Sequence, residues 1–286
     1  MASAQLPRHV FGPTGVSVPK VGLGTWYLEQ TDAKAAIAAV HAALELGLTH
    51  VDTAELYGSG KAESLVGQAL EGRRDEVFLV SKIIPSNASR QGTIQHCEQT
   101  LKRLRTDHLD CYLLHWPGSY PLEDTIEALE ELVTSGKTRA WGVSNFDEGE
   151  LEQALDIAGP GRIACNQVLY HLQERSIEHA VLPWCEANGV AVVGYTPFGQ
   201  NRQFPPRGPG GAVLSQLAER LGATTRQLAL AFLTRRSELF AIPKSTQLEH
   251  LRENAGGATV VLSSADIAAI DSAFPVGRRR RGVPML

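Results

Sequence analysis

The chain has 286 residues, of which 43% are hydrophobic and 20% are charged, and its formal net charge at pH 7 is -4. This length is enough for a large buried core, either in one α/β barrel or in two smaller domains. The negative charge argues against binding to nucleic acid or to an anionic membrane, because both attract basic surfaces.

The sequence contains no signal for a membrane span, for secretion or for a metal site. No stretch approaches the roughly 18 consecutive apolar residues that a transmembrane helix needs, and residues 1–9 lack an apolar segment behind a charged start. The cysteines are far apart, without a Cys-x-x-Cys pair or zinc-like spacing. We therefore expect a cytoplasmic protein with reduced thiols and no bound metal. The cysteines are Cys97, Cys111, Cys165 and Cys185.

A short hairpin is predicted at the start of the chain. Residues 10–11 and 16–18 flank Gly12-Pro13-Thr14-Gly15, which is a turn signal. Because this hairpin is too short to join a large sheet, we expect it to close the floor of a larger structure.

From residue 21 onward, strand and helix patterns alternate. Short apolar runs predict the strands, and apolar residues spaced three and four apart predict the helices. The strands are expected at residues 21–24, 47–52, 77–82, 109–114, 139–143, 163–167, 190–195 and 239–242. The helices are expected at residues 32–46, 61–70, 93–104, 121–135, 147–157, 177–188, 225–234 and 247–254.

This alternation favours a closed (β/α)8 barrel, in a single domain spanning residues 1–286, over an open doubly wound sheet. Residues 197–211 carry four prolines and several glycines and are predicted to form a loop. Residues 212–221 and 264–271 are predicted as two extra helices. No G-x-G-x-x-G motif opens a helix, so a Rossmann dinucleotide site has little support.

Three successive strands end in titratable side chains. The strand at 47–51 leads to Asp52, with Tyr57 five residues further on, and the next two strands end at Lys82 and His115. In a parallel barrel the carboxyl ends of the strands form one face, where active sites are found. A carboxylate, a phenol, an amine and an imidazole should therefore converge.

Taken singly, each of these residues has an ordinary structural interpretation. Lysines and aspartates at strand ends are usually solvated, Tyr57 could be a packing aromatic, and His115 could be a core histidine. A Tyr/Lys pair also occurs in short-chain dehydrogenases, but those keep the two residues four apart on one helix and need the glycine fingerprint. The functional interpretation therefore depends on the whole set.

An ordered series of motifs over about residues 10–270 resembles the aldo-keto reductase family. Besides the hairpin, the motifs are Gly22–Trp26, Asp52–Gly58, Ser81–Lys82, Leu114–Trp116, Gly142–Phe146, Asn166–Gln167, Tyr195–Pro197 and Ile242–Ser245. The short loops look closest to bacterial members that reduce small 2-oxo-aldehydes such as methylglyoxal, or keto sugar acids. The resemblance implies NADPH-dependent reduction of aldehydes or ketones to alcohols.

Chemistry gives reasons for the catalytic roles that the family assigns. Carbonyl reduction needs a hydride, which a nicotinamide supplies because no side chain can. It also needs a proton donor, and the Lys82 ammonium should lower the pKa of Tyr57 enough for that role. Asp52 would keep Lys82 charged through an ion pair, and His115 would hydrogen-bond the substrate oxygen as a neutral imidazole.

The resemblance also implies a cofactor site. Its residues are Gly24, Thr25, Trp26, Asp52, Ser144, Asn145, Gln167, Tyr195, Thr196, Pro197, Phe198, Ile242, Lys244, Ser245, His250, Glu253 and Asn254. The carboxamide would be bound by Ser144, Asn145 and Gln167, and Tyr195 would stack on the nicotinamide. The 2′-phosphate would be held by Lys244 and Ser245, and adenine would contact Glu253 and Asn254.

One position departs from the family pattern. The usual arginine six residues after the phosphate-binding lysine is His250 here. An arginine binds phosphate with a fixed bidentate charge, whereas a histidine gives a weaker, pH-dependent contact. We expect NADPH as the cofactor, with more tolerance of NADH than is usual.

The substrate pocket is expected to be open and to take a small carbonyl compound. Its walls would come from Trp26, Tyr57, His115 and Trp116, with Tyr27 nearby, and only a short connection follows Trp116. The run Arg278–Arg281 is either a solvated tail or a device that recruits anionic substrates or cofactor phosphates.

Two other functional classes stay open at this point. A non-catalytic barrel could bind the cofactor as a redox sensor, although such subunits usually carry an added interaction segment. A lyase or isomerase could use the same barrel, but it would need a phosphate site or metal carboxylates. For either a reductase or a sensor, we expect a monomer that does not bind nucleic acid or membranes.

Overall fold

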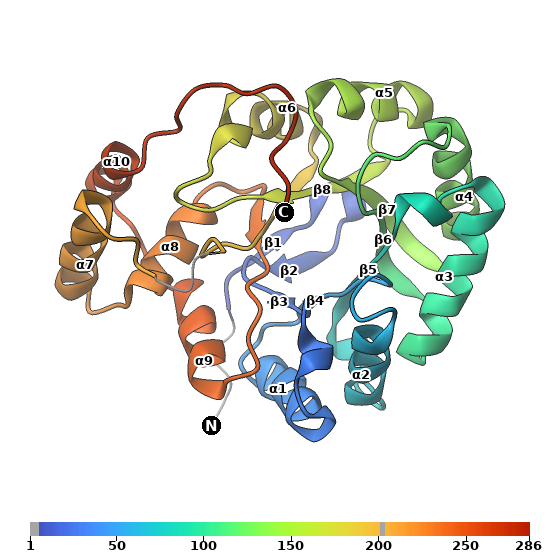
Figure 1. Ribbon diagram of the computed structural model, residues 1–286, viewed down its shortest axis with the longest axis horizontal. Coiled ribbons are helices and arrows are strands. Elements are labelled where there is room, and N and C mark those ends of the chain that lie inside the picture. The colour runs from blue at the N-terminus through green and yellow to red at the C-terminus, as the bar shows by residue number, and fades with distance from the viewer. Residues whose placement is uncertain (1–5, 201–203) are drawn as a thin grey trace.

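The protein is seen here in a computed structural model that describes residues 6–200 and 204–286, and eight parallel strands form its centre. The strands pair in sequence order, and two parallel bridges, Val21 with Ala241 and Gly24 with Lys244, connect the first strand to the last. The sheet therefore curls round until its edges meet (Figure 1). The strands are β3 (Leu23–Gly24), β4 (His50–Asp52), β5 (Phe78–Ile83), β6 (Leu109–Leu114), β7 (Thr138–Ser144), β8 (Ile163–Leu169), β9 (Ala191–Tyr195) and β10 (Leu239–Ala241).

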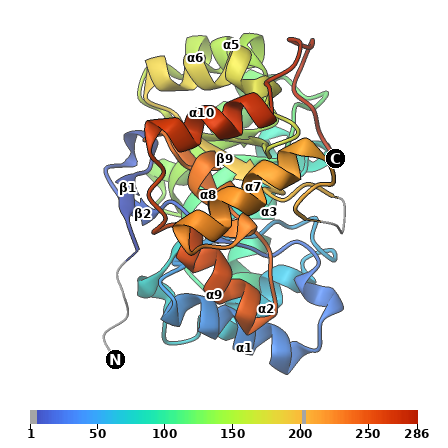
Figure 2. The ribbon, with the colours of Figure 1, turned by 90° about the vertical axis from the view of Figure 1, so that its left-hand side faces the viewer.

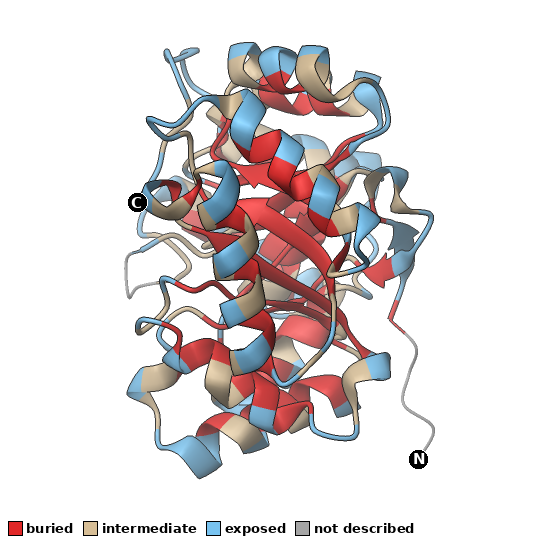
Figure 3. Cartoon of the chain, turned by 90° about the vertical axis from the view of Figure 1, so that its right-hand side faces the viewer, coloured by how far each residue is buried: buried red, intermediate tan, exposed pale blue. Residues whose placement is uncertain are grey.

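Helices surround this sheet, with their buried faces turned inward and their exposed faces outward (Figures 2 and 3). The helices are α1 (Ala33–Glu45), α2 (Lys61–Ala69), α3 (Arg90–Leu104), α4 (Leu122–Thr134), α5 (Glu148–Ala158), α6 (Val181–Asn188), α7 (Pro209–Leu221), α8 (Thr225–Leu233), α9 (Leu248–Gly257) and α10 (Ser264–Ala273). Both α7 and α8 lie between β9 and β10, and α10 follows α9. The predicted α/β fold with eight parallel strands is confirmed.

Some helix boundaries differ from the prediction, and two of these differences have a local cause. Helix α3 begins at Arg90, before the predicted residue 93, because the Ser89 side chain caps it by accepting from the Gly92 N–H. The helix predicted at 177–188 is divided into the 3-10 helix η5 (Ser176–His179) and α6, because Ala180 has a φ of -146°. The predicted loop at 197–211 ends earlier, at Gly208, and its residues 201–203 lie outside the described part of the chain.

The predicted hairpin is confirmed, and it closes the amino-terminal end of the barrel interior. Strand β1 (Arg8–Val10) pairs antiparallel with β2 (Ser17–Pro19). The fully buried ring of Phe11 lies 4.8 Å from that of Phe78 on β5 and 5.2 Å from that of Phe240 on β10, measured between centroids. Phe11 therefore fills the space between strands on different sides of the barrel.

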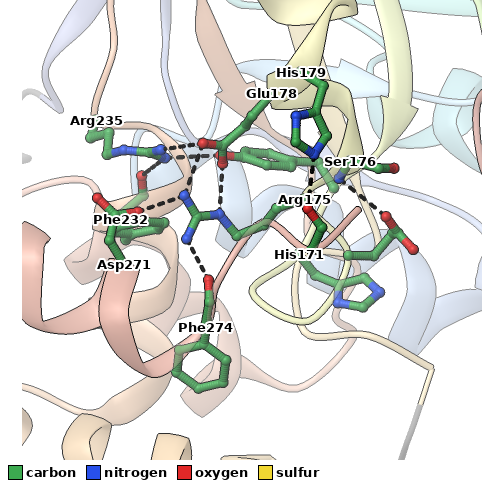
Figure 4. Close-up of polar contacts among 12 residues, drawn as sticks. His171, Arg175, Ser176, Glu178, His179, Phe232, Arg235, Asp271 and Phe274 are labelled. Atoms are coloured by element: carbon green, nitrogen blue, oxygen red, sulfur yellow. Dashed lines mark hydrogen bonds and ion pairs between the residues drawn. The ribbon is translucent and has the colours of Figure 1, made fainter. Parts of the chain in front are cut away.

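The buried side chain of Arg175 holds α10 and the tail that follows it (Figure 4). The guanidinium of Arg175 donates to Glu178 at 2.7 Å, to Asp271 at 2.6 Å and to the carbonyl oxygen of Phe274 at 2.6 Å. Arg235, just after α8, donates to the other oxygen of Glu178 at 2.9 Å. These contacts fix the point from which the C-terminal tail leaves the barrel wall.

Within residues 6–200 and 204–286, no helix combines the length and the apolar character needed to cross a bilayer. The four cysteines are all buried and unpaired with one another.

Replacing Phe11 tests the role of the hairpin. Phe11→Ala should lower the free energy of unfolding by about 3 to 5 kcal/mol, the usual cost of removing a buried phenylalanine ring. Val16→Ala, at an exposed position of the same hairpin, should change it by less than about 0.5 kcal/mol. Urea unfolding monitored by circular dichroism measures both. A loss below about 1 kcal/mol for Phe11→Ala would show that the hairpin does not complete the core.

Candidate active site

A cavity of about 670 Å³ opens at the carboxyl ends of the strands. Most of its lining residues lie at the end of a strand or in the loop that follows, which is where parallel barrels carry their active sites. The sequence-predicted residues that line it are Gly24, Thr25, Trp26, Tyr27, Asp52, Tyr57, His115, Trp116, Asn145, Gln167, Tyr195, Thr196, Pro197, Phe198, Ile242 and Lys244.

The ammonium group of Lys82 lies at the centre of this site and is fully buried. Its Nζ atom is 2.5 Å from Oδ1 of Asp52, 2.8 Å from the carbonyl oxygen of Thr53 and 3.2 Å from the hydroxyl oxygen of Tyr57. An ammonium has three donors, and each has an oxygen here. A buried charge is tolerated only when it is paired in this way.

Asp52 is held from two further directions. Its Oδ2 atom accepts from the side-chain amide of Gln167 on β8 at 2.8 Å, and its carbonyl oxygen accepts from the hydroxyl of Thr25 at 2.9 Å. Gln167 therefore orients the carboxylate toward Lys82, while Thr25 fixes the backbone of Asp52.

Burial and charge set the protonation states of these groups. Burial alone would lower the pKa of Lys82, but Asp52 and Tyr57 raise the pKa above its ordinary value, so the amine stays charged. Burial raises the pKa of Tyr57, and Lys82 opposes this only in part. Burial likewise raises the pKa of Asp52, against Lys82 and Gln167, which favour the carboxylate.

The expectation that Lys82 brings the pKa of Tyr57 below its ordinary value is therefore corrected. Lysine acts in the predicted direction, but the desolvation of the phenol is the larger effect. Tyr57 consequently holds its proton at neutral pH, which is the state that a proton donor requires.

His115 is neutral at physiological pH. Burial, with the nearby charge of Lys82, lowers the pKa of His115 well below its ordinary value. Its Nδ1 atom is buried and finds no hydrogen-bond partner in the described ranges 6–200 and 204–286. The imidazole lies edge-on to the Tyr57 ring, with the two centroids 5.9 Å apart. This position suits a group that hydrogen-bonds a substrate oxygen beside the phenol.

Asn145 ties the ends of several strands together. Its backbone has a φ of 61°. Its Oδ1 atom accepts from the Tyr195 hydroxyl at 2.9 Å, and its Nδ2 atom donates to the carbonyl oxygen of His115 at 3.1 Å. The side-chain amide of Asn145, which the sequence analysis assigned to the cofactor, thus also makes hydrogen bonds within the protein. Tyr27 and Thr196 share the positive φ and line the same cavity, and such strain gathers at functional sites.

Several predicted cofactor residues lie outside the cavity wall. These are Ser144, Ser245, His250, Glu253 and Asn254. The Ser245 hydroxyl accepts from the Gln247 N–H at 3.0 Å, just before α9, and Glu253 on α9 is 3.9 Å from Arg226. Except for Ser144 at the end of β7, these residues lie just before α9 or within it, beyond Lys244 in the chain.

The sequence prediction missed residues that the C-terminal tail brings to the site. Met285 and Leu286 line the cavity, as does Leu56, and the chain ends above the middle of the strands (Figure 1). Arg279 pairs with Glu148 and Arg280 with Glu174. All four arginines of the run are exposed, as expected for a solvated tail, and two of them contact the barrel through these ion pairs. No periodic pattern in the tail could have signalled its path.

In the described part of the chain, no group of three or more His, Cys, Asp or Glu side chains is arranged to hold a metal ion.

Known proteins match this chain over nearly its whole length. The profile of the aldo/keto reductase family matches residues 20–274. The methylglyoxal reductase YeaE of Escherichia coli is 42% identical over 273 residues, covering 95% of this chain and 96% of that protein. A crystal structure of an aldo/keto reductase from Klebsiella pneumoniae with NADP and acetate is 41% identical, with a TM-score of 0.91 and coverage of 97% and 99%. One from the same organism with NADPH is 41% identical, with a TM-score of 0.90 and coverage of 99% and 100%.

The buried pair can be tested through stability. Lys82→Met should destabilise the protein by about 3 to 5 kcal/mol, because it leaves the Asp52 carboxylate buried and unpaired. Asp52→Asn in the same background should recover part of that loss, since the unpaired charge disappears. Arg90→Ala, which breaks an exposed pair with Glu127, should cost no more than about 1 kcal/mol. Urea denaturation gives all values, and strict additivity of the Asp52 and Lys82 changes would contradict the pairing.

Proposed function

Because the chain belongs to the aldo/keto reductase family, we propose that it reduces aldehydes or ketones to alcohols with NADPH and with Tyr57 as proton donor. The observation that carries this proposal is the buried ammonium of Lys82, which contacts both the Tyr57 hydroxyl and the Asp52 carboxylate, with Tyr57 and His115 on the cavity wall. Small 2-oxo-aldehydes such as methylglyoxal are the proposed substrates, with keto sugar acids as a second group. The name of the Escherichia coli relative, a methylglyoxal reductase, supports the first.

The cavity has the chemical groups that a nicotinamide dinucleotide needs. Amides from Asn145 and Gln167 lie on its wall together with the ring of Tyr195, and these suit a carboxamide on a flat heterocycle. Lys244 lines the same cavity, shortly before the first turn of α9, where a cation and free backbone N–H groups favour a phosphate. When bound, the cofactor supplies the hydride. Relatives crystallised with NADP and NADPH support the choice of cofactor.

The protein's own residues supply the proton and the electrostatics. The hydroxyl of Tyr57 gives its proton to the carbonyl oxygen as negative charge develops there. The charged amine 3.2 Å away stabilises the phenolate that remains. Asp52 keeps that amine ionised and aimed, and the neutral imidazole of His115 orients the substrate oxygen. Trp26 and Trp116 line the cavity with apolar surface beside these groups.

A non-catalytic sensor barrel fits these contacts less well. Cofactor binding alone needs groups such as those around Tyr195 and Lys244, but it does not explain why an ammonium is buried against a phenol.

For the whole chain we propose a closed (β/α)8 barrel with two extra helices, α7 and α10, as a single domain over residues 1–286. We further propose that it acts as a cytoplasmic monomer.

Tyr57→Phe tests the proton donor. Loss of the phenolic hydroxyl should lower kcat by about 10²- to 10⁴-fold, the usual contribution of a positioned general acid. Binding of NADPH should stay close to that of the wild type, because the ring is kept. The readout is the loss of NADPH absorbance with methylglyoxal, with fluorescence titration of cofactor binding as control. Equal turnover by the variant would contradict the role of Tyr57.

Lys244→Ala tests the phosphate contact. The variant should lose about 10- to 100-fold in kcat/KM with NADPH, because a hydrogen bond to a charged group contributes roughly 1.5 to 3 kcal/mol. With NADH the change should be small, since the 2′-phosphate is missing. Lys102→Ala, an exposed lysine on α3, serves as the matched control. Equal losses with the two cofactors would exclude the phosphate role.

A further inference from the structure

The loop that carries Tyr57 consists of turns, without a helix or a strand. It lies between the end of β4 at Asp52 and the start of α2 at Lys61, and its residues Gly58, Ser59 and Gly60 all have positive φ. We propose that Glu55 is a positioning residue, whose carboxylate fastens this loop to the end of the strand that carries Lys82.

One oxygen of Glu55 binds the chain just after Lys82. Its Oε1 atom accepts from the backbone N–H of Ile84 at 2.9 Å and from the side-chain amide of Asn87 at 3.1 Å. The backbone N–H of Glu55 also donates to the carbonyl oxygen of Lys82 at 3.3 Å. Main chain and side chain of Glu55 are therefore both attached to the same strand end.

The other oxygen binds a helix behind the loop. Oε2 is 2.6 Å from Nδ1 of His96 on α3. Glu55 is only 8% exposed, and burying a carboxylate is costly unless hydrogen bonds replace its water. Here a backbone N–H, an amide and an imidazole provide them. The carboxylate thus joins the Tyr57 loop, the end of β5 and α3 at one point.

Glu55 sets the position of the Tyr57 side chain and is not among the charges that shift its pKa. The charges that shift the pKa of Tyr57 are those of Lys82 and Asp52, whereas Glu55 faces away from the cavity toward Ile84 and His96. The contact between Tyr57 and Lys82 spans 3.2 Å, which is the long end of the hydrogen-bond range. Catalytic groups must be held to within about 0.5 Å, so a small shift of the loop would break it.

The inference rests on the proposed function, because its test measures a rate that depends on proton donation by Tyr57. The test is a double-mutant cycle of wild type, Glu55→Ala, Tyr57→Phe and the double variant, assayed with NADPH and methylglyoxal. Glu55→Ala should lower kcat by about 10- to 100-fold, as loss of outer supporting groups typically does. The KM for NADPH should hardly change. In the Tyr57→Phe background, the same substitution should have no further effect.

Two variants separate positioning from general loss of stability. Glu55→Gln keeps an oxygen for the Ile84 N–H and should restore most of the activity. Asp110→Ala is the matched control, because Asp110 is also a buried carboxylate that accepts a backbone N–H from β5, that of Leu79 at 2.8 Å, at the opposite end of the strand. It should lower stability in urea without lowering kcat at a temperature where it is folded.

The outcomes are distinct. Equal rate losses from Glu55→Ala in both backgrounds, or a matching kcat loss in Asp110→Ala, would overturn the positioning role. Full activity of Tyr57→Phe alone would instead overturn the proposed function.

Discussion

The structure depends on one buried ammonium group. Lys82 can stay charged inside the barrel only because Asp52, Thr53 and Tyr57 surround it with oxygen atoms. Without them, burial would favour the neutral amine. The partners come from β4 and the loop after it, and Gln167 on β8 holds the far side of Asp52. Strand pairing brings these elements together, and it therefore also determines that Lys82 stays protonated.

The barrel separates stability from chemistry. Its amino-terminal end is closed by the hairpin, where Phe11 packs among aromatic rings. Its carboxyl end stays open, and there the backbone is strained at Tyr27, Asn145 and Thr196. The protein tolerates this backbone strain because the well-packed strands below stabilise the folded state. The polar groups at this end are buried and held in place beneath the open cavity.

Much of the fold and of the central site could be predicted from the sequence. Alternating periods located the strands, and the residues at their ends, Asp52, Lys82 and His115, followed from the rule that parallel strands share one carboxyl face. Quantities that depend on three-dimensional burial could not be predicted. The pKa of Tyr57 is raised overall because the desolvation of the phenol exceeds the effect of Lys82. The sequence indicates that Lys82 is close to Tyr57, but it does not show how far the phenol is removed from water. The place of Met285 in the cavity wall was equally hidden, because it depends on the three-dimensional path of a tail without regular structure.

The most direct test of the central claim is the titration of the Tyr57 phenol itself. Ultraviolet difference spectra between the wild type and Tyr57→Phe isolate its ionisation from that of the other tyrosines. We predict that the phenol is protonated at neutral pH and that its pKa lies above the ordinary value of 10.0. Joint replacement of Asp52 by Asn and Lys82 by Met should move that ionisation still higher. A phenolate at pH 7, or a pKa of Tyr57 that is unchanged by the loss of Lys82 and Asp52, would show that Lys82 does not act on the phenol.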